Sequence, residues 1–335
     1  MLNFPILFFA YFAVKPFDNL QIRHPQSKIP NMVDGILIID KPVDWTSHDV
    51  VGKMRKILKT KRIGHTGTLD PFATGVLVIL VGNATRLAQF LDKDVKGYEA
   101  VVKFGFETDT GDLTGLRRLE CGLRIDEIEE ILGKTNWDEI FASFRGEISQ
   151  VPPMYSAKKV DGKKLYELAR KGIEIDRKPV SVTIYELRLM EAILTPKSHI
   201  GIRTSCSAGT YIRTLAEDIG RKIGVGAHLF ALRRTQAGKF GIGKAVTLEQ
   251  LEQIVSENKL DEVLISMNDA LKFLPEIKLS ADEIRKTQNG VSVSYKSSEI
   301  KDNQVFRMID ENNNLIAIGF YNGEKNVIQP RIVLV

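Results

Sequence analysis

The chain has 335 residues, of which 43% are hydrophobic and 27% are charged. This length predicts two domains or one large domain with an appendage, and this composition excludes wholesale disorder. Its 47 basic and 42 acidic residues give a net charge of +5, and its only cysteines, Cys121 and Cys206, exclude a disulfide framework and a cysteine-based zinc site. We therefore expect a reducing, cytoplasmic setting.

The first fourteen residues, MLNFPILFFAYFAV, form an apolar run that is too short to span a bilayer and is interrupted by Pro5. The run also lacks the positive segment that begins a secretory signal. A polar linker follows, and Met32 stands just before the first predicted strand. We therefore treat residues 1–34 as an N-terminal extension and expect Met32 to be the true start.

The first half of the remaining chain alternates strands and helices. A short apolar run predicts a buried strand at 35–40, and apolar residues at helical spacing predict a helix that Thr46 or Ser47 caps. The predicted elements that follow are a glycine-rich turn at 63–75, a central strand from 76, a helix at 84–91, a strand at 98–106, an irregular loop at 107–124 and two short helices at 124–144. In the strand at 98–106, alternation places Tyr98, Ala100, Val102 and Phe104 on one face.

The second half begins at the break Val151-Pro152-Pro153, after which a basic loop ends in a helix. The predicted elements that follow are a strand pair at 180–194 and 200–206, a helix at 211–223 capped by Thr210, a strand at 232–242 and a last helix at 247–254. After a second break near 273–275, short strands and Asn/Gly turns predict a small β module. The fold class is therefore α+β, with a mixed, mostly antiparallel sheet.

Basic residues gather in three windows. Residues 52–64 hold six Lys or Arg and no acid, residues 151–180 hold eight basic and four acidic residues, and residues 228–244 hold four basic residues and no acid. Residues 275–335 hold eight of each sign. This distribution indicates a face that binds a polyanion, although each window alone is equally typical of a solvated surface.

Two stretches have the composition of a catalytic site. In GHTGTLDPFATG, Pro71 favours an extended backbone at Asp70, so a carboxylate lies on a constrained loop before an apolar strand. An ordinary Asp-Pro turn with a solvated carboxylate fits the same residues. In CSAGTYIR, Tyr211 and Arg213 stand where a strand gives way to a helix, and Arg213 could pair with a carboxylate. A plain helix terminus with Tyr211 as a packing residue is the alternative there.

The five histidines form no metal-binding pattern, and no dinucleotide or nucleotide-triphosphate motif occurs. We therefore expect no metal and no cofactor.

Six stretches resemble, in order, the motifs of the TruB family of tRNA pseudouridine synthases. They are GILIIDKPVDWTSHDVV, GHTGTLDPFATGVL, GYEA, VPPMYSAKKVDGKKLYELAR, CSAGTYIRTLAEDIG and GAHLFALRRT, from Gly35 to about Thr235. The resemblance implies a bacterial-type enzyme that converts uridine 55 in the T-loop of tRNA to pseudouridine, without cofactor or metal. It also implies that the protein is a monomer that binds the T-arm stem-loop and no membrane.

The resemblance also assigns roles to individual residues. Asp70 matches the catalytic aspartate, Tyr98 the tyrosine that stacks on the target base and is a candidate general base, and Arg213 the partner of the carboxylate. The substrate-binding positions that it implies are His65, which helps base flipping, Tyr211, Leu232 in the uracil pocket, and Lys41 and Pro42, which support the catalytic loop. The predicted RNA contacts are Lys158, Lys159, Lys163, Lys164 and Arg233.

The resemblance also implies a domain plan. Residues 35–256 form the catalytic domain, with a thumb-like insertion at 151–178 that contacts RNA, and residues 275–335 form a small domain resembling the PUA fold. Two other activities use the same residues: an RNA chaperone that refolds the T-arm, and an N-glycosidase that would release free uracil.

Overall fold

The computed structural model describes residues 33–92, 95–156, 158–160, 162–190, 198–296 and 300–334. The predicted N-terminal extension and the start at Met32 therefore lie almost entirely outside the described residues. Within the described part, no helix is long and apolar enough to cross a membrane.

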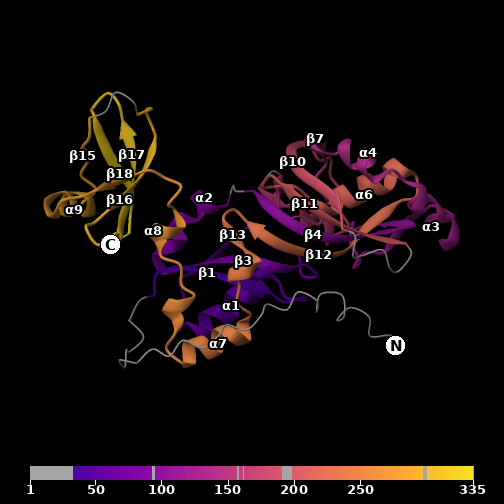
Figure 1. Cartoon of the computed structure of the whole chain (residues 1–335), viewed down its shortest axis with the longest axis horizontal. Coiled ribbons are helices and arrows are strands. Elements are labelled where there is room, and N and C mark those ends of the chain that lie inside the picture. Colours follow the sequence, from indigo (N-terminus) through magenta and orange to yellow (C-terminus); the bar gives the residue numbers. More distant parts are fainter. Residues whose placement is uncertain are drawn as a thin grey trace.

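A large sheet forms the centre of the molecule (Figure 1). Its strands run in the order β1-β3-β12-β4-β11-β10-β7, with β2 paired to β3 and β13 paired to β12. Neighbouring strands are antiparallel except for a short parallel contact between β12 and β3. Their bounds are β1 Gly35–Lys41, β2 Ile63–Thr66, β3 Thr74–Val81, β4 Lys96–Phe104, β7 Gly146–Gln150, β10 Val180–Leu189, β11 His199–Cys206, β12 Ala227–Ala237 and β13 Phe240–Gly241.

The predicted alternation of β4 is confirmed. Tyr98, Ala100, Val102 and Phe104 all belong to one buried apolar cluster, which also contains the inner face of helix α6 (Ile212–Ile223). The neighbouring β12 adds Ala227, Leu229 and Leu232 to this cluster, and a bulge between Leu229 and Ala231 shifts the alternation so that Leu232 faces it. This face of the sheet carries the candidate site.

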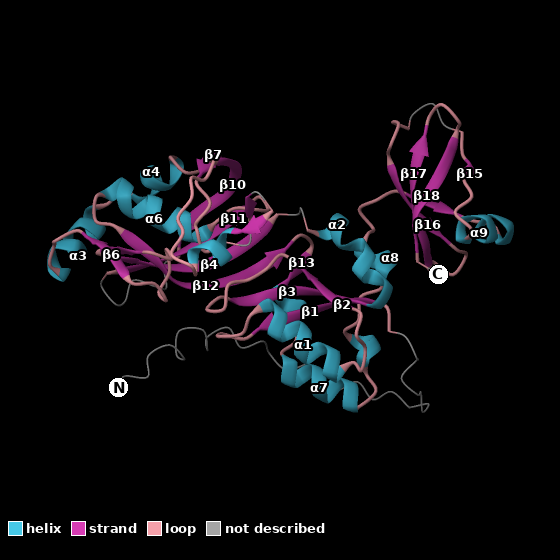
Figure 2. Cartoon of the chain, turned by 180° about the vertical axis from the view of Figure 1, so that it is seen from behind, coloured by secondary structure: helices cyan, strands magenta, loops and turns pink. Residues whose placement is uncertain are grey.

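Helices cover both faces of the sheet (Figure 2). Helix α1 (Ser47–Ile57) packs with α7 (Leu248–Ser256) on one side, and α6 packs against β12 on the other. The cap predicted at Thr46 is confirmed, because Thr46 and Asp49 bind each other's backbone amides in a capping box. The remaining helices are α2 Ala88–Leu91, α3 Ile125–Lys134, α4 Trp137–Ala142, α5 Leu165–Ala169, α8 Met267–Ala270 and α9 Ala281–Gln288, with 3-10 turns at Gly82–Leu87, Ile242–Lys244 and Leu260–Glu262.

The C-terminal segment forms its own sheet, in the order β14-β16-β17-β18-β15. The bounds of these strands are β14 Glu276–Lys278, β15 Val293–Ser294, β16 Val305–Ile309, β17 Leu315–Asn322 and β18 Val327–Val333. The predicted α+β class, with a mostly antiparallel sheet and a β-rich C-terminal part, is therefore confirmed. The likeness of this part to the PUA fold and the domain boundaries stay predictions.

Several details of the sequence prediction are wrong. The strand predicted at 232–242 begins at Ala227 and ends at Ala237, and a turn at 238–239 separates it from β13. Residues 107–124 are not wholly irregular, because β5 (Phe106–Thr108) and β6 (Arg117–Glu120) form a hairpin whose second strand is fully exposed and therefore shows no apolar alternation. Helix α6 is capped by Tyr211 and not by Thr210, because the Thr210 hydroxyl donates to the Ser207 carbonyl at 2.9 Å. The helix at 247–254 is not the last one, since α8 and α9 follow it.

Candidate active site

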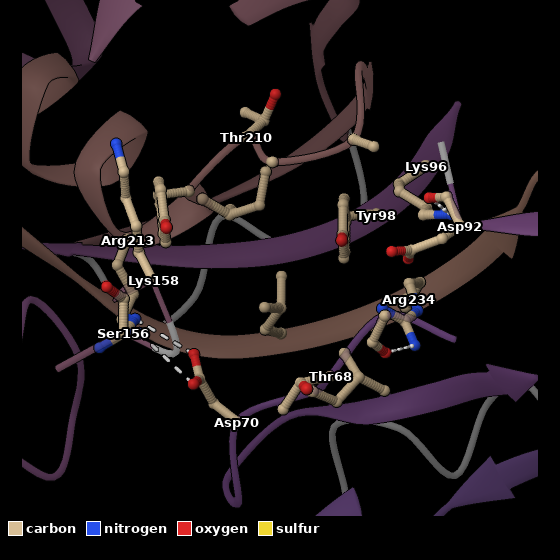
Figure 3. Close-up of a pocket in the computed structure, with 17 residues that line it drawn as sticks. Thr68, Asp70, Asp92, Lys96, Tyr98, Ser156, Lys158, Thr210, Arg213 and Arg234 are labelled. Atoms are coloured by element: carbon tan, nitrogen blue, oxygen red, sulfur yellow. Dashed lines mark hydrogen bonds and ion pairs between the residues drawn. The ribbon is translucent and has the colours of Figure 1, made fainter. Parts of the chain in front are cut away.

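A cavity of about 280 Å³ opens over the sheet between β4, β12 and the start of α6 (Figure 3). The loop of residues 67–70 forms its floor, and residues 208–213 form the opposite wall. Ser156 and Lys158 contribute a third side from the predicted insertion. Five distant segments of the chain therefore meet at one cavity.

The loop that carries Asp70 is fixed by buried polar contacts. The Lys41 ammonium, which is fully buried, donates to the carbonyls of Pro42, Trp45 and Pro71 at 2.8, 2.5 and 3.0 Å. The Ser47 hydroxyl accepts from the amide of Leu69 at 3.0 Å. Burial lowers the pKa of Lys41 to about 8, while the nearby Asp70 carboxylate acts in the opposite direction. Lys41 therefore supports the loop from beneath, as its motif implies.

Asp70 and Arg213 form a two-point ion pair. Arg213 Nε lies 3.1 Å from Asp70 Oδ2, and Arg213 Nη2 lies 3.3 Å from Asp70 Oδ1. Burial raises the pKa of the Asp70 carboxyl, and Arg213 opposes this effect. The carboxylate keeps 35% of its side-chain surface exposed at the cavity. The guanidinium therefore favours the ionised form of a carboxyl whose pKa burial raises.

Arg213 is itself held by several acceptors. Its Nη1 donates to the Thr110 carbonyl at 3.0 Å and lies 3.5 Å from Asp112 Oδ2. Its Nη2 donates to the Tyr155 carbonyl at 2.7 Å. The Arg213 side chain is only 7% exposed, so the direction of the guanidinium toward Asp70 is set by these contacts.

Tyr211 reaches the cavity from the cap position of α6. The Gln150 side chain, at the end of β7, accepts from the Tyr211 amide at 3.0 Å and donates to its carbonyl at 3.2 Å. This pair of bonds replaces a side-chain cap and fixes the start of the helix that carries Arg213. The structure thus brings Tyr211 and Arg213 to the same cavity as Asp70.

Tyr98 on β4 and Leu232 on β12 line the cavity beside Asp70, as predicted. Arg234, which pairs in register with Tyr98, lines it as well. Its Nε donates to the Val76 carbonyl at 2.7 Å and its Nη2 to the Gly67 carbonyl at 2.9 Å. Burial raises the pKa of the Tyr98 hydroxyl, and the adjacent Arg234 opposes this change.

The sequence prediction named Arg233 and missed Arg234. Residues two apart on a strand share a face. Because Leu232 was assigned to the pocket, the sequence could have indicated Arg234 as a second pocket residue. Arg233 lies on the other face, where its guanidinium binds both oxygens of Asp40 at 3.0 and 2.6 Å. Asp112 was also missed, because its irregular loop carries no periodic pattern.

Other predicted site residues lie outside the group that lines the cavity. His65 stands on β2 with its ring 5.6 Å from that of His48, and burial lowers its pKa so that the neutral form is favoured. Pro42 adjoins Lys41 and contacts it through its carbonyl. Lys163 is exposed, and Lys159–Val160 (β8) pairs with Lys163–Lys164 (β9) in a hairpin beside Lys158. The side chains of Lys159 and Lys164 lie outside the described part.

Within the described residues, no group of three or more His, Cys, Asp or Glu side chains is placed to hold a metal ion. The polar groups at the cavity are instead arranged as a carboxylate with a guanidinium partner, next to a tyrosine ring and a leucine. This arrangement can carry nucleophilic or proton-abstracting carboxylate chemistry on a planar ligand that stacks on Tyr98.

Comparison with known proteins agrees with this arrangement. Residues 55–212 match the profile described as "TruB family pseudouridylate synthase (N terminal domain)", and residues 213–272 match "tRNA pseudouridylate synthase B C-terminal domain". A protein of Solibacter usitatus named tRNA pseudouridine synthase B is 40% identical over 86% of this chain and 95% of its own length. A protein of the same name from Clostridium kluyveri is 43% identical, again over 86% of this chain and 95% of its own length.

Among solved structures, the crystal structure of a Cbf5-Nop10-Gar1 complex contains a similar chain. It has a TM-score of 0.66 and 25% identity, and the match covers 90% of this chain and 85% of that one. The fold is therefore shared along nearly the whole length. From these matches, together with the geometry around Asp70, the chain belongs to the TruB family of pseudouridylate synthases.

Proposed function

We propose that this isomerase acts on tRNA and converts the uridine at position 55 of the T-loop to pseudouridine. The observation that carries the proposal is the Asp70–Arg213 ion pair inside a cavity that Tyr98 and Leu232 also line. The names of the curated relatives support tRNA as the substrate. The position within the tRNA rests on the motif resemblance.

The reaction exchanges one glycosidic bond for another. The bond between N1 and C1′ breaks, the uracil turns, and C5 bonds to C1′; the proton on C5 is then lost and N1 gains one. Asp70 either attacks C1′ or removes the C2′ proton, and both routes need an ionised carboxylate. Arg213 favours the ionised form, because its charge opposes the rise in the pKa of Asp70 that burial causes. Tyr98 is the candidate base for the C5 proton.

The small cavity requires the target base to leave its stack. A cavity of about 280 Å³ is suited to a single nucleoside, so the uridine enters it flipped out of the T-loop. Tyr98 stacks on the base with Leu232 on the other side, Tyr211 completes the wall, and Lys41 and Pro42 support the loop beneath. His65, on β2 outside the cavity, contacts the displaced nucleotides. Its neutral, aromatic ring suits stacking rather than a phosphate contact.

The RNA backbone is held by basic residues at the rim. Lys158 lines the cavity, and the hairpin that carries Lys159, Lys163 and Lys164 adjoins it. Arg233 completes the RNA-binding set of the proposal, although its ion pair with Asp40 leaves it less available than the lysines.

The test is tritium release from a tRNA transcript labelled at C5 of uridine, with the wild type and Asp70→Asn compared. We expect the wild type to release tritium, and the release to map to position 55. In Asp70→Asn, the rate of release should fall by about a thousandfold or more. The affinity for tRNA should change by less than about threefold, since phosphate contacts dominate binding. Release by both proteins would show that Asp70 is misassigned. Release by neither, with T-arm refolding intact, would favour the chaperone activity, and free uracil would favour the glycosidase.

A further inference from the structure

Ser156 presents a buried hydroxyl to the candidate site. The residue is 5% exposed and lines the cavity, and its Oγ has no hydrogen-bond partner among the residues that the structure describes. Its backbone is fixed, because its carbonyl accepts from the Tyr166 amide at 3.1 Å at the start of α5. The hydroxyl thus stands at a defined place in the cavity wall.

The same segment is docked on the catalytic ion pair. The carbonyl of Tyr155, one residue before Ser156, accepts from Arg213 Nη2 at 2.7 Å, and that nitrogen also contacts Asp70 Oδ1 at 3.3 Å. Figure 3 shows Ser156 next to the Arg213 head group, on the side from which the dashed lines lead to Asp70. Ser156 is therefore close to the position where Asp70 acts.

A buried hydroxyl without a partner is unfavourable, because it has lost its hydrogen bonds to water, and buried side-chain polar atoms are paired in most proteins. Thr66 and Thr287 also carry such hydroxyls, but neither residue lines the cavity. At Ser156 alone of these three, the residue lines the space that a substrate fills, so a rotation of its side chain would bring the covered Oγ into that space. Its partner is therefore to be sought on the substrate.

We infer that the Ser156 hydroxyl hydrogen-bonds the ribose 2′-hydroxyl of the nucleotide being isomerised. This rests on the proposed function, in which Asp70 acts at C1′ or C2′ and so brings that ribose beside Arg213. A neutral 2′-hydroxyl suits the place better than a phosphate does, because the carboxylates of Asp70 and Asp112 both lie against Arg213 and would repel an anion. A hydroxyl both donates and accepts hydrogen bonds, so the 2′-hydroxyl can donate a hydrogen bond to the Ser156 hydroxyl or accept one from it.

The contact would make Ser156 a substrate-binding residue that distinguishes ribose from deoxyribose at the target position. The experiment is a binding cycle in the full-length Asp70→Asn protein, in which no turnover occurs. Dissociation constants are measured for T-arm stem-loops that carry uridine or 2′-deoxyuridine at the target, each with Ser156 and with Ser156→Ala. We expect Ser156→Ala to weaken binding of the uridine stem-loop by about three- to tenfold, as for one hydrogen bond, and that of the deoxyuridine stem-loop by less than twofold.

Equal weakening for both RNAs would overturn the inference, because it would place the contact on a phosphate or indicate a structural effect. No weakening for either RNA would overturn it as well. Ser156→Thr keeps the hydroxyl and should restore the discrimination, and Ser143→Ala, which removes an exposed hydroxyl on α4, should change neither constant. Tritium release by the wild type on the same stem-loop separates the two proposals. If tritium is released but Ser156→Ala weakens binding of both RNAs equally, only the role of Ser156 is overturned. If no tritium is released, the proposed function is overturned and this inference with it.

Discussion

At the scale of single residues, the candidate site depends on a charged carboxylate in surroundings that disfavour its charge. Burial raises the pKa of the Asp70 carboxyl, and Arg213 opposes this rise. The contacts of Arg213 to Thr110, Tyr155 and Asp112 fix the orientation of its guanidinium. Such an arrangement reacts without further rearrangement, because the guanidinium is already in place. The geometry on which the proposed role of Asp70 depends is therefore built largely by Thr110, Tyr155 and Asp112, none of which lines the cavity.

One step further along α6, Glu217 lies partly buried between Arg213 and Arg221. Burial raises its pKa to about 7 from 4.5, and Arg221 opposes this only in part, since the closest distance between the two side chains is 3.9 Å. The folded state thus holds the proton more tightly than the unfolded chain does. The free energy of unfolding should therefore fall as the pH rises from about 4.5 to above 7, by on the order of 3 kcal/mol from this residue.

We expect Glu217→Gln to remove this dependence, because the amide is neutral at every pH. The variant should match the wild type at pH 5 and exceed it at pH 8 by on the order of 1–3 kcal/mol, measured by urea unfolding at both pH values. Glu262→Gln, at an exposed position in the turn Leu260–Glu262, is the matched control and should leave the difference between pH 5 and pH 8 unchanged. An unaltered pH dependence in Glu217→Gln would show that other groups cause it.

Motif residues, Lys41 among them, could be identified from the sequence, whereas the polar supports that stand outside the motif assignments could not. Asp70, Tyr98, Tyr211, Arg213 and Leu232 stand in motifs, and the structure gathers all of them at one cavity. Gln150, which holds the start of α6, and Ser47, which holds the Asp70 loop, act across 61 and 22 positions of sequence. No local pattern records a contact over such a distance, because it arises only when the sheet has formed.

At the scale of secondary-structure elements, the long periodic elements were predicted, whereas several of the shortest ones were not. The strands β1, β4 and β11 and the helices α1 and α6 have enough apolar positions to show a period. β2, β7 and α8 have four or five residues each, too few for a periodic pattern to stand out from chance. Yet β7 ends at Gln150, which holds the start of α6, so a short element that the sequence hides supports the candidate site.

The hairpin of β8 and β9 is the element to which we assign RNA binding in the proposed function. Replacing Lys158, Lys159, Lys163 and Lys164 together by Gln should weaken tRNA binding at low salt, because lysines that contact phosphates release counterions. If all four contact phosphates, the slope of log affinity against log salt concentration should become shallower by about three. The measurement is a salt titration of tRNA affinity by filter binding or fluorescence anisotropy.

A matched control removes the same charge elsewhere. Lys278, Lys286, Lys301 and Lys325 are exposed in the C-terminal part, and their replacement by Gln changes the net charge equally. We expect a smaller effect on the slope from this variant, because these lysines stand among as many acidic residues as basic ones. An equal effect of both variants would mean that overall charge, and not the hairpin, determines affinity.

At the scale of the whole molecule, the two sheets share an apolar core. One buried cluster joins Ile36, Val78 and Leu80 of the large sheet to Ile318 and Ile332 of the C-terminal sheet. The Arg307 guanidinium, buried at the junction, donates to the Leu274 carbonyl and to the Asn268 side chain. The sequence predicted a separate β module for the C-terminal part, because its strands and turns are formed by neighbouring residues. The contact between the two sheets could not be predicted in this way, because it depends on residues from distant parts of the chain.

This shared core predicts that the two sheets unfold together. Ile318→Ala removes a fully buried side chain of β17 from the cluster and should lower the free energy of unfolding by about 2–5 kcal/mol. The two tryptophans of the chain, Trp45 and Trp137, both belong to the part that contains the large sheet, so their fluorescence reports on that part alone. In a urea titration, the midpoints from tryptophan fluorescence and from far-ultraviolet circular dichroism should therefore shift to lower urea by the same amount. A fluorescence midpoint that stays in place while the circular dichroism curve becomes biphasic would show that the C-terminal sheet unfolds by itself, and that the cluster does not couple the two sheets.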